Sequence, residues 1–311
     1  MRYRVIFMGT PEFAVPALRV LLESEEVVAV VTQPDRPRGR GRRLRPSPVK
    51  EVALSAGLPV LEPERLKDPE FLSALKAFSP DLIVVAAYGK ILPREVLELP
   101  RLGCWNIHAS LLPAYRGADP IRWAILRGER RTGITIMQMD EGLDTGPILL
   151  QKETEIGEEE TGGELYARLS VLGAEALLET LSLHKEGRLK PRPQPEEGVS
   201  YAPPIKKEDA RLDFSLPAGE LSLRIRAFDP RPGAFTLLEG KIFKLFRPEA
   251  LSENPPDPPG TILGVREGRL LVTCGEGILA VSEVQLEGKR RVPVAEFLKG
   301  HRLSPGTRLG S

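Results

Sequence analysis

The residues best suited to chemistry in this 311-residue chain are Asn106 and His108, which lie two positions apart after an apolar stretch that predicts a strand. Side chains at i and i+2 of a strand point to the same face, so the carboxamide and the imidazole would converge on one spot. Asp144 follows in a loop over residues 139–147, and we expect it to pair with His108. Such a trio can orient a carbonyl, stabilise the oxyanion formed when that carbonyl is attacked, and move the displaced protons.

A lone histidine at the end of a strand is more often a satisfied, half-buried residue than part of a site. His108, however, lies in a loop rich in Pro and Gly, where chemistry is usually displayed on a rigid scaffold, whereas His184 and His301 lie among charged residues. Cys104 and Cys274 fall in apolar runs and are expected to be inert core thiols. Because the cysteines do not cluster and the histidines lack HxxxH spacing, we expect no metal.

The elements that must position these residues follow an α/β pattern. Over the first 150 residues, short β-like apolar runs alternate with helical patterns, which predicts a mostly parallel sheet with helices on both faces. The clearest strands are predicted at 4–8, 27–32 and 81–86, with helices at 14–22 and 69–78. The first strand ends in Gly9-Thr10-Pro11 rather than GxGxxG, so we expect a Rossmann-like sheet without NAD or FAD.

The C-terminal part has a different pattern. A predicted helix over 162–184 precedes the proline-rich stretch 187–204, which has no periodicity and indicates a stiff linker. Beyond a short helix near 218–227, β runs are predicted at 234–238, 241–246, 260–266, 269–274 and 279–286, with a terminal helix near 294–298. This arrangement resembles an oligonucleotide/oligosaccharide-binding (OB) barrel. We therefore predict a catalytic domain over 1–189, a linker over 190–206 and an OB-like domain over 207–311.

The overall composition indicates the class of protein but does not indicate a binding partner. The chain has 44 basic and 43 acidic residues, so its net charge does not indicate nucleic acid. Two cysteines, no N-terminal apolar signal and no apolar run near 18 residues predict a soluble protein of a reducing compartment, with the cytoplasm as the default. Nothing in the pattern demands a coiled coil or another obligatory protein partner, and we expect a monomer.

The distribution of charge is more informative, because residues 33–50 read QPDRPRGRGRRLRPSPVK. This segment predicts a mobile cationic loop that forms neither a core nor a regular element. Guanidinium groups bind phosphates and stack on unpaired bases, so the loop suits a nucleic-acid substrate that is gripped near its end. A solvated charged loop is the alternative. The residues expected to bind RNA are Arg36, Arg38, Arg40, Arg42, Arg43 and Arg45.

Together these residues resemble the folate-dependent formyltransferase superfamily. The shared motifs are Asn106-x-His108, Ser110-Leu-Leu-Pro113 with Arg116-Gly117, and the Asp144 loop followed by Gly146-Pro147. The whole chain is similar to the branch that acts on initiator tRNA, through its opening FMGTPEFAVPAL, its RGRGRRLRPSPVK loop, AAYGKILP at 86–93, and IRAFDPRPGAF before the barrel.

The resemblance implies an enzyme of translation initiation that transfers the formyl group of 10-formyltetrahydrofolate to the α-amino group of methionyl initiator tRNA, without a metal. Asn106 and protonated His108 would stabilise the oxyanion, and Asp144 would hold His108 and relay the proton. The arginine loop would enter the acceptor arm of the tRNA, and the barrel would hold the inner side of that arm. The folate pocket implied by the resemblance is lined by Tyr88, Gly89, Ile91, Leu92, Ser110, Leu111, Leu112 and Pro113.

Three alternatives stay open at this point. The same site could formylate a small amine such as a nucleotide sugar, which would leave the arginine loop and the barrel without a function. Water could replace the amine and make the protein a deformylase. In a different class, the chain could be a non-catalytic RNA-binding protein on a decayed scaffold, although the intact Asn106, His108 and Asp144 argue against decay.

Overall fold

The computed structural model describes residues 2–38 and 43–310, and the chain divides into two compact units that interleave along the sequence. The first unit comprises Met1–Pro120, Arg131–Glu155 and Tyr166–Pro203, and the second comprises Ile121–Arg130, Ile156–Leu165 and Pro204–Ser311. The linear domain limits proposed from the sequence stay a prediction. Among the described residues, no helix is long and apolar enough to cross a membrane.

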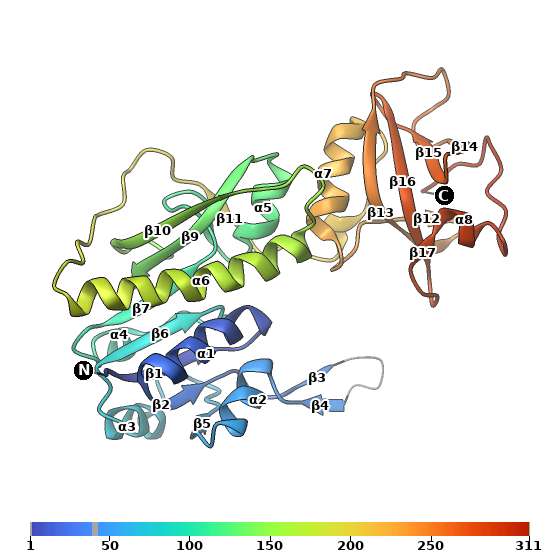
Figure 1. Ribbon diagram of the computed structural model, residues 1–311. Coiled ribbons are helices and arrows are strands. Elements are labelled where there is room, and N and C mark those ends of the chain that lie inside the picture. The colour runs from blue at the N-terminus through green and yellow to red at the C-terminus, as the bar shows by residue number, and fades with distance from the viewer. Residues whose placement is uncertain (1, 39–42, 311) are drawn as a thin grey trace. The chain divides into compact units, whose positions relative to one another are not determined.

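The first unit is built on a mostly parallel sheet (Figure 1), as predicted. Its strands lie in the spatial order β10-β9-β7-β6-β1-β2-β5. β9 runs in the opposite direction to the other strands of this sheet, which are parallel to one another. The bounds are β1 Arg4–Gly9, β2 Glu26–Val31, β5 Val60–Leu61, β6 Leu82–Ala86, β7 Cys104–His108, β9 Arg131–Gln138 and β10 Ile148–Glu155. Every residue of β6 is buried, the pattern expected of a parallel strand covered on both faces.

Helices cover both faces of this sheet, which confirms the predicted layers. On one face, Ile6 and Met8 of β1 belong to a buried cluster with Phe71 and Leu75 of α3. On the other face, α6 approaches closely, because a Cβ at Gly173 would lie 2.8 Å from the side chain of Ile107. The helices of this unit are α1 Val15–Ser24, α2 Pro48–Ser55, α3 Pro69–Ala77, α4 Arg94–Leu97 and most of α6 Gly162–Lys185, with a 3-10 turn at Glu12–Ala14.

The strand order creates a switch point at β1. The chain goes from β1 to β2 on one side, and it later returns to place β6 on the other side. Loops that leave the carboxyl ends of β1 and β6 therefore diverge, and such a crevice is where open α/β sheets bind ligands.

The arginine-rich segment contains a short antiparallel hairpin of β3 Arg36–Arg38 and β4 Arg43–Arg45. The prediction that this segment forms no regular element is therefore wrong. Backbone groups alone make the ladder of a strand pair, so pairing does not require apolar side chains. Arg40 and Arg42 lie outside the described residues.

The second unit contains a curled antiparallel sheet in the order β12-β13-β16-β15-β14. β17 pairs with Glu283 and Val284 of β16, beyond the residues of β16 that pair with β15. The meander β14-β15-β16 and the return that places β13 beside β16 form a Greek-key connection. The strand bounds are β12 Phe235–Leu238, β13 Lys241–Leu251, β14 Ile262–Arg266, β15 Arg269–Thr273, β16 Ile278–Leu286 and β17 Val292–Pro293. The helices are α5 Pro120–Leu126, α7 Ala218–Phe228 and α8 Val294–Phe297, with a 3-10 turn at Glu208–Ala210. The predicted C-terminal β unit is confirmed.

One strand of this unit is longer than predicted. The sequence pattern predicts an end at Phe246. Pro248, which follows, cannot donate to a ladder. In the structure Arg247 adopts a positive φ of 50°, and Pro248 resumes pairing opposite Val281. A local irregularity thus carries the strand past its proline.

Candidate active site

Asn106 and His108 lie at the carboxyl end of β7, and strand alternation separates them from the residues that face α6. Trp105 packs edge-on against His184 of α6, so Asn106 and His108 lie on the opposite face. Asn106 pairs in register with Val85 of β6. The predicted convergence of the carboxamide and the imidazole on one face is present.

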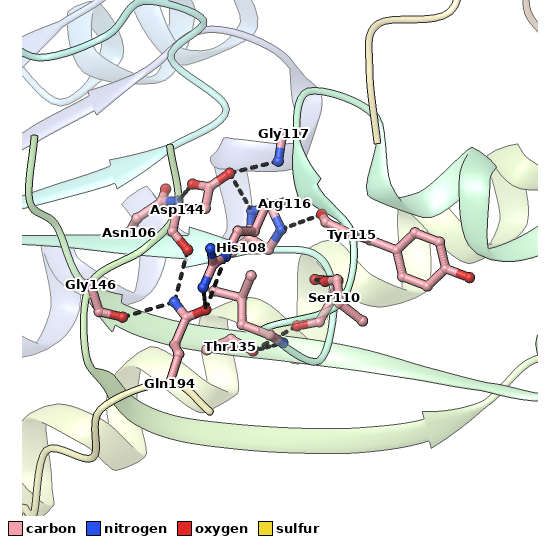
Figure 2. Close-up of polar contacts among 12 residues, drawn as sticks. Asn106, His108, Ser110, Tyr115, Arg116, Gly117, Thr135, Asp144, Gly146 and Gln194 are labelled. Carbon is pink, nitrogen blue, oxygen red and sulfur yellow. Dashed lines mark hydrogen bonds and ion pairs between the residues drawn. The ribbon is translucent and has the colours of Figure 1, made fainter. Parts of the chain in front are cut away.

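Asp144 reaches this pair from the loop between β9 and β10 (Figure 2). Its Oδ1 accepts a long hydrogen bond from Asn106 Nδ2 at 3.4 Å, and its Oδ2 lies 3.7 Å from His108 Nδ1. Oδ2 also accepts a bond from the backbone N–H of Gly117 at 2.8 Å. A backbone donor and two side chains thus hold the carboxylate at the centre of the cluster.

His108 is buried, with 5% of its side chain exposed, and its two ring nitrogens have different surroundings. Nε2 lies 2.9 Å from the carbonyl oxygen of Tyr115. Because a carbonyl only accepts, Nε2 carries a hydrogen and donates it. Nδ1 is therefore the nitrogen that can exchange a proton beside Asp144, and protonation there would make an imidazolium next to a carboxylate.

Gln194 was not predicted as a site residue, yet it holds the Asp144 loop. Its Nε2 donates to the backbone carbonyls of Asp144 at 2.7 Å and Gly146 at 2.8 Å. Its Oε1 accepts from Arg116 Nη2 at 2.7 Å and from Nε at 3.2 Å (Figure 2). The stretch interpreted as a linker thus supplies a clamp to the site. A single polar amide between prolines, in the run PRPQP, was the only signal in the sequence.

The same stretch also holds the loop that follows β7. Ser200 Oγ accepts a hydrogen bond from the backbone N–H of Tyr115 at 2.9 Å, and the backbone carbonyl of Ser200 accepts one from the backbone N–H of Arg116 at 2.9 Å. The short strands β8 Arg116–Gly117 and β11 Tyr201–Ala202 continue this pairing in parallel. Tyr115 and Gly117, whose backbone groups contact His108 and Asp144, are thereby fixed.

The Ser110–Pro113 turn, expected to form a folate shelf, is held by contacts within the protein. Ser110 is buried and donates to the carbonyl of Ala114 at 2.6 Å, and Leu112 is buried in a small cluster with Met137 and Ile148. Thr135 Oγ1 joins the two ends of the turn by donating to Ser110 O and accepting from Leu112 N. Leu111 and Pro113 are partly exposed.

Three residues in the loops of the site have a strained backbone. Ala87, Tyr115 and Asp144 follow β6, β7 and β9, and they have positive φ values of 46°, 60° and 54°. Non-glycine residues in this left-handed region cost about 1–3 kcal/mol each and persist where the surrounding contacts hold them. The hydrogen bonds from Gly117 and Gln194 are contacts of that kind for Asp144.

Two cavities flank the loop after β6. Tyr88 and Gly89 line one of about 240 Å³, while Ile91 and Leu92 line another of about 490 Å³. The stretch predicted to contact folate is therefore divided between two spaces. Ile91 in the lining of the larger one is 81% exposed, and Leu143, next to Asp144 in the sequence, is 51% exposed.

Thiol and metal chemistry find no site in the described parts of the chain. Burial raises the pKa of the Cys104 thiol to about 12 and that of Cys274 to about 11, so both thiols are protonated near neutral pH. Within residues 2–38 and 43–310, no cluster of three or more His, Cys, Asp or Glu could hold a metal ion.

Comparison with known proteins relates both parts of the chain to one group. A family model described as formyl transferase matches residues 1–181, and one described as formyl transferase, C-terminal domain, matches residues 204–302. The methionyl-tRNA formyltransferase of Myxococcus xanthus is 52% identical over 98% of this chain and 97% of its own length.

Solved structures share the fold. HypX from Aquifex aeolicus, solved in complex with tetrahydrofolic acid, has a TM-score of 0.64 at 21% identity, over 98% of this chain and 49% of its own. A methionyl-tRNA formyltransferase from Clostridium thermocellum has a TM-score of 0.56 at 17% identity, over 91% of this chain and 98% of its own.

Proposed function

The chain belongs to the formyl transferase family, and on that premise we propose that it transfers the formyl group of 10-formyltetrahydrofolate to the α-amino group of methionyl initiator tRNA. The observation that carries the proposal is the cluster of Asn106, His108 and Asp144 in a chain so similar to a methionyl-tRNA formyltransferase along its whole length. That similarity favours a tRNA acceptor over a small amine or water.

Asn106 and His108 are proposed to stabilise the oxyanion that forms when the amine attacks the formyl carbon. One N–H of Asn106 Nδ2 binds Asp144, which leaves the second N–H of the same amide for the substrate oxygen. His108 supplies the other donor through Nδ1, since its Nε2 is held by Tyr115. Donors aimed at developing negative charge are commonly the largest contribution to acyl transfer.

Asp144 is proposed to move the proton. A free α-amino group titrates at roughly 7.7–8.0, so the attacking amine must lose a proton before or during attack. Asp144 lies 3.7 Å from His108, close enough for a carboxylate to stabilise the imidazolium and to pass a proton toward the leaving nitrogen, directly or through one water. Its carboxylate is positioned by Gly117, so it needs little rearrangement.

The larger cavity, whose lining includes Glu141 of the Asp144 loop, is proposed to bind the folate. Its volume of about 490 Å³ lies within the range of about 300–1,000 Å³ that is usual for small-ligand pockets. Ile91 offers an apolar surface to a flat ring, and Lys67, Lys90 and Arg94 in the lining offer cations to the carboxylates of a glutamyl tail. Leu111 and Pro113 would contribute side chains from the Ser110–Pro113 turn, whereas buried Ser110 and Leu112 would act by shaping it.

The RNA contacts are proposed for the arginine hairpin and for the C-terminal unit. Arg36, Arg38, Arg43 and Arg45 lie on β3 and β4, whereas Arg40 and Arg42, outside the described residues, are proposed from the sequence alone. Arginines concentrated on one short hairpin suit phosphates of an acceptor arm. The Greek-key order of the C-terminal sheet supports an OB-like domain that binds RNA, and we infer a monomer that acts in the cytoplasm.

The test is formyl transfer from 10-formyltetrahydrofolate to methionyl initiator tRNA by the wild type and by Asn106→Ala. Loss of one oxyanion donor typically lowers kcat by about 10²–10³-fold. The matched control is Asn254→Ala, because Asn254 is the other asparagine in the chain and accepts from the backbone N–H of Gly277 in the second unit. Equal losses in both variants, or none in either, would contradict the assignment. A wild type that formylates only small amines would overturn the proposed substrate.

A further inference from the structure

The smaller cavity, of about 240 Å³, has no role in the chemistry described above. It lies at the carboxyl ends of three adjacent strands, beside the switch point at β1. Its lining includes Thr10 after β1, Gln33 and Asp35 after β2, Arg45 of β4, Ser47 before α2, and Gly89 after β6. The volume is below the range of about 300–1,000 Å³ for whole small ligands, which suits one part of a larger substrate.

One carboxylate oxygen of Asp35, in the cavity wall, accepts no hydrogen bond from the protein. Its Oδ2 accepts from Lys50 Nζ at 2.8 Å, whereas its buried Oδ1 has no hydrogen-bond partner within the described residues. Buried carboxylate oxygens are normally satisfied, so an orphan in a cavity wall points to a ligand that donates hydrogen bonds.

Gln33 presents an amide that is already oriented. Its Nε2 donates to the carbonyl of Tyr88 at 2.8 Å, and its backbone N–H lies 3.3 Å from Thr10 Oγ1. Gly89 makes room for it, because a Cβ there would lie 2.7 Å from Gln33 Nε2. A fixed amide beside a carboxylate is suited to reading the edge of a base: glutamine pairs with adenine, and carboxylates accept from exocyclic amines.

Arg45 adds a cation to the same lining. Its side chain is exposed at the end of the hairpin, where its guanidinium can bind a phosphate. An amide, a carboxylate and a guanidinium around one small space match the parts of a nucleotide. The thioether of a methionyl side chain has no hydrogen to donate, so it would leave Asp35 Oδ1 without a donor.

We propose that this cavity binds the 3′-terminal nucleotide of the acceptor strand, with the adenine amine on Asp35 and Gln33 and a phosphate near Arg45. The inference rests on the proposed function, since it names how the acceptor end is held. Every tRNA ends in adenosine, so the cavity recognises the common end of the acceptor rather than the identity of one tRNA.

The distance to the reacting groups agrees with this placement. Asn106 of β7 pairs with Val85 of β6, which in turn pairs with Met8 of β1. Neighbouring strands lie about 4.8 Å apart, so the ends of β7 and β1 are separated by roughly 10 Å. An aminoacyl ester and its ribose span a gap of this size, which lets the base sit in the cavity while the amine lies beside Asn106.

Kinetics with methionyl initiator tRNA test the proposal through Asp35→Asn and Gln33→Ala. Each should raise KM for the tRNA at least about fivefold, the lower end of what a base contact is worth. The value of kcat should change by less than about twofold, since no group that touches the reacting atoms is altered. The control is Glu62→Gln, because Glu62 is the other carboxylate on Lys50, at 2.7 Å, and does not line the cavity.

A rise in KM for Asp35→Asn and Gln33→Ala but not for Glu62→Gln supports the cavity as the nucleotide site. Equal KM values in the wild type and both cavity variants, or an equal rise in Glu62→Gln, overturn the inference while leaving formyl transfer intact. Thermal unfolding of each variant shows whether the fold is kept, and Gln33→Ala preserves the ion pairs of Lys50 if Asp35→Asn unfolds.

Titration with adenosine 5′-monophosphate decides the same question without turnover. The backbone amide signals of Thr10, Gln33 and Gly89 should shift in NMR spectra of the wild type, and the shifts should be lost in Gln33→Ala. Cytidine 5′-monophosphate should shift them less, and inorganic phosphate should move only signals near Arg45. Equal effects of all three probes would show a phosphate site alone and overturn the base assignment. If the wild type fails to formylate any tRNA, the proposed function is wrong, and this titration alone decides the cavity.

Discussion

Replacing Gln194 by glutamate tests whether the proline-rich stretch holds the Asp144 loop in its working position. The change conserves size and keeps an acceptor for Arg116, which already bonds Oε1 at 2.7 Å. It replaces the Nε2 donor by an oxygen that faces the carbonyls of Asp144 and Gly146, at 2.7 and 2.8 Å. Two attractive contacts therefore become repulsive.

The magnitude follows from those two bonds. Each hydrogen bond contributes about 0.5–1.5 kcal/mol, so the loop loses roughly 1–3 kcal/mol of restraint. Asp144 has a positive φ of 54°, a conformation that itself costs about 1–3 kcal/mol, and it would relax once the restraint is gone. A change of 1.36 kcal/mol is a factor of ten in a population, and small displacements of a catalytic group can cost about 10²-fold. We expect kcat to fall by about 10–100-fold in Gln194→Glu.

Steady-state formyl transfer with saturating folate checks this expectation. KM for the tRNA should stay within about threefold of the wild-type value, because Gln194 contacts the Asp144 loop rather than the acceptor. Gln285→Glu is the matched control, since Gln285 also donates through Nε2 to a backbone carbonyl, that of Lys289, but on the surface of the second unit. If Gln194→Glu turns over as fast as Gln285→Glu while both remain folded, the positioning argument is refuted.

Three further predictions concern groups away from the reacting atoms. Tyr88 is buried, its hydroxyl has no hydrogen-bond partner among the described residues, and burial raises the pKa of Tyr88 to about 12. The free energy of unfolding of Tyr88→Phe, measured in urea, should therefore equal that of the wild type or exceed it by up to about 1 kcal/mol. Because burial also raises the pKa of the Cys104 and Cys274 thiols, a thiol reagent near pH 8 should label the native protein slowly and the urea-unfolded protein completely; rapid native labelling would contradict their burial. Hydrogen bonds from Lys50 to Asp35 and Glu62 raise the pKa of Lys50 above 10.5, so the stabilisation of the fold by these contacts is fully present below pH 10.5 and is lost as the pH rises through the folded-state pKa. Lys50→Met should therefore have a lower free energy of unfolding than the wild type at neutral pH, and it should lose less of that free energy above pH 10.5. Equal free energies of unfolding at neutral pH would show that the ion pairs contribute nothing.

Much of the first unit could be predicted because its signals are local. The apolar runs of β1 and β6 are buried on both faces, and such runs are typical of parallel strands. Asn106 and His108 could be paired on one face from their spacing alone, since alternation is a property of any strand. The C-terminal β unit was visible for the same reason, apart from the continuation of β13 past Pro248.

The pairing of the arginine segment could not be predicted, because its composition argues only against a core. Arg36–Arg38 and Arg43–Arg45 pair through their backbones, and composition carries no signal for such pairing. The burial of Ser110 and Leu112 could not be predicted either, because it depends on Thr135, Met137 and Ile148 from other strands.

By itself, the sequence determined which chemical groups this protein has and which of them share a strand, a helix or a loop, since period and turn residues act over a few positions. Only the tertiary structure decided which distant groups meet. Asp144 reaches Asn106 across 38 positions, and Gln194 reaches Asp144 across 50, through hydrogen bonds whose partners are set by how separate loops pack at one edge of the sheet. Such contacts depend on distance and direction in space, and residue types along a chain record neither.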